Sequence, residues 1–101
     1  MPDSPQYWKP PDSIVRVIEQ ADLIRVTVAA MAPSTPQMWG HPLKVDPASL
    51  ADDVAELAGR EMTLSVLVDQ ITKALINRGW IGETIFQTAV DITEKIVESD
   101  S

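Results

Sequence analysis

The sequence contains no cysteine and only one histidine, His41. The absence of cysteine excludes disulfide bonds, thiolate nucleophiles and zinc sites built on sulfur. A single imidazole gives no histidine pair for a metal site, and a base without a neighbouring nucleophile does not make a catalytic dyad. No run of 18 apolar residues is present, so neither a transmembrane helix nor a secretory leader is predicted. We therefore expect a soluble, cytoplasmic protein that is not an enzyme and uses no metal or other cofactor.

Positive charge is also scarce. Eight Lys and Arg residues stand against 15 Asp and Glu residues, which gives a formal net charge of −7. Residues 1–45 contain four acids and four bases, so the whole excess lies in residues 46–101. Because nucleic-acid affinity comes largely from Lys and Arg, direct nucleic-acid binding is not expected. One alternative is that the acidic half mimics a nucleic acid and occupies the basic groove of a DNA-binding protein.

Proline positions divide the chain into segments. Four of the eight prolines fall within residues 1–12, which predicts an extended, Pro-rich arm that also contains Trp8. Three further prolines and Gly40 fall within residues 32–46, which predicts a long irregular loop. The remainder, residues 13–98, is long enough for one domain, and residues 99–101 are expected to fray.

Apolar residues at steps of three and four predict four helices, over residues 13–31, 47–58, 63–78 and 83–98. The helix boundaries carry their own signals. Asp46-Pro47 is a typical helix start, Thr63 is placed to cap the third helix, and Gly79 follows its last turn. The predicted fold class is all-α: a small four-helix bundle-like domain with an extended Pro-rich N-terminal arm.

The first predicted helix has two unusual features. Residues from Ile24 onward alternate in a strand-like way and include several β-branched side chains, so an α+β fold with a short strand at about residues 23–29 is the alternative. If the segment is a helix, a second apolar patch lies on its far side, formed by Val15, Leu23, Val26 and Ala30. Such a helix needs to be covered on two sides.

Large apolar side chains exceed what one simple helical core needs, and Trp and Met are enriched at the centres of protein interfaces. We therefore predict a small acidic protein–protein interaction module, acting as a homodimer or as a regulatory or accessory partner of a larger protein. No membrane partner is expected. The predicted contact residues are Trp8, Met38, Trp39 and Trp80 as anchors, with Phe86, Val90 and Val97 as an exposed sector of the last helix.

A different class of function remains open from the sequence. The chain could be a small-molecule-binding or accessory enzyme domain whose pocket lies under the loop of residues 32–46. His41 would then be the polar group among apolar walls. This alternative predicts an effect of substitutions at His41 and Trp39, whereas the interaction module does not depend on the imidazole.

Overall fold

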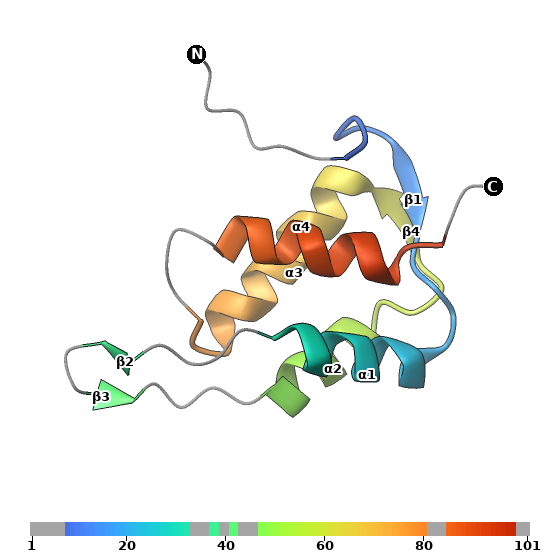
Figure 1. The fold of residues 1–101 in the computed structure, drawn as a ribbon. Helices are drawn as coiled ribbons and strands as arrows, with labels where there is room; N and C mark the ends of the chain where they lie inside the picture. Colours follow the sequence, from blue (N-terminus) through green and yellow to red (C-terminus); the bar gives the residue numbers. More distant parts are fainter. Residues whose placement is uncertain (1–7, 33–36, 39–40, 43–46, 81–84, 99–101) are drawn as a thin grey trace, which may run out of the picture.

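The computed structural model describes residues 8–32, 37–38, 41–42, 47–80 and 85–98 (Figure 1). This part of the chain is mostly helical. Its helices are α1 (Ala21–Met31), α2 (Pro47–Ala55), α3 (Leu64–Asn77) and α4 (Ile85–Ile96). Strands β1 (Ile14–Arg16) and β4 (Glu61–Thr63) form one antiparallel pair, and β2 (Gln37–Met38) and β3 (His41–Pro42) form another.

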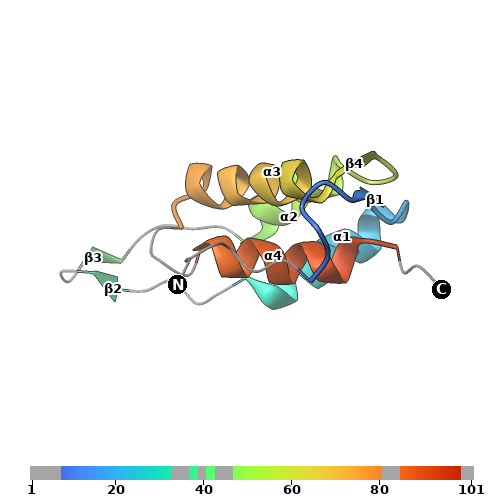
Figure 2. The same ribbon diagram turned by 90° about the horizontal axis from the view of Figure 1, so that it is seen from above.

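The helices are arranged as two closely packed pairs. α1 packs chiefly against α2, α3 packs chiefly against α4, and α4 also contacts α1. In Figure 1, α3 and α4 form the upper part of the domain, and α1 and α2 form the lower part. α3 and α4 cross each other obliquely in Figure 1, and in Figure 2 they lie one beside the other along the length of the domain.

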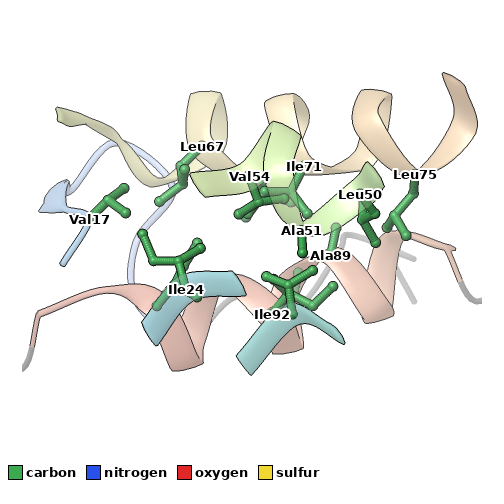
Figure 3. Close-up of a cluster of buried hydrophobic side chains, with 14 of the residues drawn as sticks. Val17, Ile24, Leu50, Ala51, Val54, Leu67, Ile71, Leu75, Ala89 and Ile92 are labelled. Atoms are coloured by element: carbon green, nitrogen blue, oxygen red, sulfur yellow. The ribbon is translucent and has the colours of Figure 1, made fainter. Parts of the chain in front are cut away.

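A continuous apolar core fills the space between the helices (Figure 3). Every helix contributes residues to this core at the spacing expected for one buried face. The side chains that point into it and are at most 3% exposed include Val17, Ile24, Leu50, Ala51, Val54, Leu67, Ile71, Leu75, Ala89 and Ile92.

The chain around β1 connects three distant parts of the sequence. On one side, the backbone N–H of Val17 donates to the carbonyl of Arg60, over 2.9 Å. On the other side, Ile18 N–H donates to Ile96 and Glu98 N–H donates to Arg16, over 2.9 and 2.8 Å. Because this backbone is hydrogen-bonded on both edges, residues 14–18 hold β4 and the end of α4 together.

Residues 10–13 cap the N-terminus of α3. Leu64 N–H donates to the carbonyl of Ser13 over 2.8 Å, and Ser65 N–H donates to Pro11 over 2.9 Å. Val66 N–H donates to Oγ1 of Thr63 over 3.3 Å. The first three amides of the helix, which have no partner within the helix itself, are thereby satisfied.

Two of the predicted helices, 63–78 and 83–98, are confirmed within two residues at each end by α3 and α4. The predicted helix 47–58 is shorter, since α2 ends at Ala55. The predicted helix 13–31 is wrong over residues 13–20, because β1 pairs with β4 there and α1 begins only at Ala21. The alternative strand at 23–29 is also wrong, because those residues lie within α1.

The small sheets correct the all-α prediction: the fold is mostly helical, with short strands. The predicted irregular loop, residues 32–46, contains the β2–β3 pair, and its other residues from 33 onward lie outside the described part. In the predicted arm, residues 10–13 form a turn, with Ser13 N–H donating to the Pro10 carbonyl. Residues 1–7 and the predicted tail, 99–101, lie outside the described residues.

Candidate interaction surface

The outer face of α1 is apolar and open to solvent. Leu23 is 50% exposed and Val26 is 67% exposed, although both are large apolar residues. Ala29 and Ala30 are exposed beside them, whereas Ile24 and Val28 on the opposite face are fully buried. With 3.6 residues per turn, these four exposed side chains lie on one side of the helix. We call Leu23, Val26, Ala29 and Ala30 the α1 outer face.

The α1 outer face itself contains no charged residue. The charged residues of α1 are Asp22 and Arg25, whose side chains form an ion pair over 2.8 Å. Arg25 also donates to Asp52 of α2 over 3.0 Å. From Val26 to Met31 the helix has no charged residue. A partner would therefore meet apolar side chains, with the charges already paired at one end.

Most of this surface belongs to the second apolar patch predicted for the first helix, although the predicted contact residues lie elsewhere. Leu23, Val26 and Ala30 were predicted to form a second apolar patch, and all three are exposed on α1. Val15 was predicted to belong to the same patch, which is wrong. It lies in β1, faces the core and is 4% exposed.

Several predicted contact residues are inside the molecule instead. Trp80 is 2% exposed and Val90 is 5% exposed, so neither is a surface residue of the single chain. Phe86 and Val97 are half-buried and pack against the core. The prediction of an exposed sector on the last helix is therefore wrong. The broad apolar sector of α4 is wide because α3, α1 and the chain at Val17 all pack against it.

The other predicted anchors, Trp8, Met38 and Trp39, lie in the first 40 residues of the chain. Trp8 is 36% exposed, so it is partly accessible to solvent. Met38 lies in β2, but its side chain and the whole of Trp39 lie outside what the structure describes. The role of these residues in binding a partner stays a prediction.

A groove lies between α2 and α3, with a volume of about 380 Å³. Its floor is apolar, and its rim is polar and mostly exposed. The lining residues are Asp53, Val54, Glu56, Leu57, Arg60, Gln70, Ile71, Lys73, Ala74 and Asn77. Lys73 pairs with Asp69 over 3.0 Å. This groove is not the pocket predicted under residues 32–46, and the side chain of His41 lies outside the described residues.

Asp53, which lines the groove, forms a two-pronged ion pair with Arg78. Nε and Nη2 of Arg78 donate to the two carboxylate oxygens of Asp53 over 2.7 and 2.8 Å. These hydrogen bonds hold the pKa of Asp53 below its ordinary value of 3.8. Partial burial of the carboxylate raises the pKa, and the positive charge of Arg78 adds to the lowering. The Asp53 carboxylate is therefore engaged in an ion pair within the chain.

The ion pairs of α2 affect the alternative prediction that the acidic half mimics a nucleic acid. Asp52, Asp53 and Glu56 are the acids that follow one another along α2 and the turn after it. Asp52 pairs with Arg25 and Asp53 pairs with Arg78. Two of the three carboxylates are thus partly neutralised within the chain, which weakens the electrostatic case for a mimic.

Within the described residues, no group of three or more His, Asp or Glu side chains is placed to hold a metal ion. None of the helices in this part of the chain has the length and apolarity needed to cross a membrane. Comparisons with protein-family models, curated proteins and solved structures find no match to this chain.

Proposed function

We propose that this chain is a protein–protein interaction module that binds through the α1 outer face. The observation that carries the proposal is the combination of exposed Leu23 and Val26 with the absence of charge from Val26 to Met31. Single exposed apolar residues are normal on proteins. A contiguous row that also lacks charge has the composition of an interface centre, from which charged residues are depleted.

The free energy gained when a partner covers this face is modest. Full burial of a Leu or Val side chain stabilises by about 1.5–3 kcal/mol, so covering the exposed parts of Leu23 and Val26 contributes about 2 kcal/mol. Ala29 and Ala30 let the backbone of a partner approach closely. The Asp22–Arg25 pair lies at the edge, where charges affect the rate and orientation of association more than the affinity.

Photo-crosslinking tests this proposal. A photoreactive phenylalanine analogue at Val26 or Leu23 is expected to give discrete covalent adducts in cells that produce the protein. The matched control is the same analogue at Ile76 on α3, which is 53% exposed but lies outside the α1 outer face. Adducts at Val26 and Leu23 without those at Ile76 would support the proposal. If Val26 and Leu23 gave no discrete adduct, or gave the same products as Ile76, the proposal would be wrong.

A further inference from the structure

We infer that the groove between α2 and α3 binds a small-molecule monocarboxylate with an apolar chain, and that Arg60 is the residue that pairs with the carboxylate. The groove shares no residue with the α1 outer face, so this inference does not depend on the proposed function. Three observations lead to it: the side chain of Arg60 has no ionic partner, the floor of the groove is apolar, and the charges around the groove balance.

Arg60 differs from the other three arginines of the chain. Arg16, Arg25 and Arg78 each pair with at least one carboxylate. Within the described part of the chain, Arg60 forms no ion pair, although its side chain is exposed and lines the groove. With 15 acids and 8 bases, this chain has enough carboxylates to pair every arginine. A guanidinium has a planar fork of donors that fits a carboxylate, so Arg60 is available to a carboxylate from outside the chain.

Apolar side chains form the floor of the same groove. Leu57 and Ala74 are half-buried there, and Val54 and Ile71 beneath them are buried. The volume of about 380 Å³ lies near the lower end of the range of roughly 300–1,000 Å³ that is typical of small-molecule sites. The groove therefore suits a small ligand whose main contact with the protein is apolar.

The charges around the groove favour a ligand with a single negative charge. Two acids, Asp53 and Glu56, and two bases, Arg60 and Lys73, line it, so the lining is neutral in sum. Asp53 and Lys73 are already in ion pairs within the chain. The net charge of −7 repels multiply charged anions such as phosphate. A monocarboxylate satisfies Arg60 at the lowest electrostatic cost, and a cation bound at Glu56 is the arrangement to be tested against it.

The size of the groove sets the expected strength. For a probe of the size of octanoate, the usual efficiency of small ligands gives a Kd on the order of 5 mM. Each methylene group that is fully covered by the floor should raise the affinity by up to about four-fold. Pairing with an exposed arginine contributes less, a factor of about two to five.

NMR titration of the isotope-labelled full chain with sodium octanoate tests the inference, with sodium chloride as the reference for ionic strength. The backbone amide signals of Leu57, Arg60 and Ala74 should shift as octanoate is raised to about 20 mM, several times the expected Kd. Affinity should rise from hexanoate through heptanoate to octanoate. Octanol, which lacks the charge, and octylammonium, which reverses it, should both bind more weakly than octanoate.

Substitutions at Arg60 test the ion pair. Arg60→Gln should weaken octanoate binding by about two- to five-fold and leave octanol binding unchanged. Arg60→Lys retains the charge and should bind octanoate more tightly than Arg60→Gln does. The matched control Arg16→Gln makes the same change at an exposed arginine that does not line the groove, and it should bind octanoate like the wild type. Circular dichroism spectra check that each variant keeps the fold.

Four results would overturn the inference. The first is the absence of amide shifts up to about 20 mM octanoate, and the second is a set of shifts confined to the α1 outer face around Val26. The third is octylammonium binding as tightly as octanoate, which would indicate Glu56 instead. The fourth is Arg60→Gln binding octanoate like the wild type. None of these results affects the proposed function, which photo-crosslinking at Val26 tests separately.

Discussion

Leu23 and Ile24 are neighbours on α1, yet the structure gives them opposite environments. Leu23 is half exposed, and Ile24 is fully buried between α1 and the rest of the core. Replacing each in turn with alanine removes side-chain carbon at adjacent positions of the same helix. We predict that Ile24→Ala is strongly destabilising and that Leu23→Ala is nearly neutral in a dilute solution of monomers.

The magnitudes follow from burial. Ile24→Ala loses about three buried carbon groups at about 0.8 kcal/mol each and leaves a cavity, for a total of about 2–5 kcal/mol. Leu23 is half exposed, so its truncation forfeits at most about 1 kcal/mol, part of which the high helix propensity of alanine restores. If Ile24→Ala does not fold, Ile24→Val is the milder substitution, with an expected loss of about 0.5–1.5 kcal/mol.

Urea unfolding followed by circular dichroism measures both differences, with the m-value checking that the transition stays two-state. The measurement should be made at about 5 µM, so that association does not contribute. Equal losses for Leu23→Ala and Ile24→Ala would refute the reasoning, because the α1 outer face would then be covered by the chain itself. No free surface would remain for a partner.

Three further predictions concern other parts of the fold. Thr63→Ala removes the side-chain cap of α3 and should lower the free energy of unfolding by about 1 kcal/mol in urea, whereas Thr63→Ser should retain most of it. Asp53→Asn should lower stability at neutral pH. Because folding depresses the pKa of Asp53 below 3.8, this loss is full above that pH and disappears as pH falls through the folded-state pKa, which urea titrations at several pH values would show. Trp80→Ala should cost about 3–5 kcal/mol, and Trp80→Phe should remove the fluorescence component least accessible to acrylamide; quenching of all indoles to the same extent would contradict the burial of Trp80.

Local signals in the sequence predicted α3 and α4 because the groups that define them are close along the chain. Thr63 lies three residues from the amide that it caps, and Gly79 follows the last turn of α3 with a φ of 103°, which favours glycine. β1 could not be predicted in this way. Its hydrogen-bonding partners are near Arg60 and Ile96, more than 40 residues away, so the segment alone gives no sign that both edges are paired.

The apolar sector of α4 is as broad as the sequence predicts, but the reason for its breadth is not the predicted one. A broad sector arises when a helix packs against several neighbours and equally when one side is free for a partner. In α4 the first cause applies, since α3, α1 and Val17 surround it. In α1 the second patch is instead open, at Leu23 and Val26. Periodicity counts apolar side chains but does not show which neighbours cover them.

Charge is the property that distinguishes the α1 outer face from Ile76, another exposed apolar residue. Ile76 is as exposed as Leu23, but charged residues both precede and follow it on the chain, at Lys73 and Arg78. On α1, the charged side chains Asp22 and Arg25 pair with each other at one end, and no charge follows them. Water held around a charged group must be removed before a partner can bind, and a neutral face avoids that cost. The absence of charge, more than the number of apolar atoms, therefore makes α1 the surface on which a partner is expected.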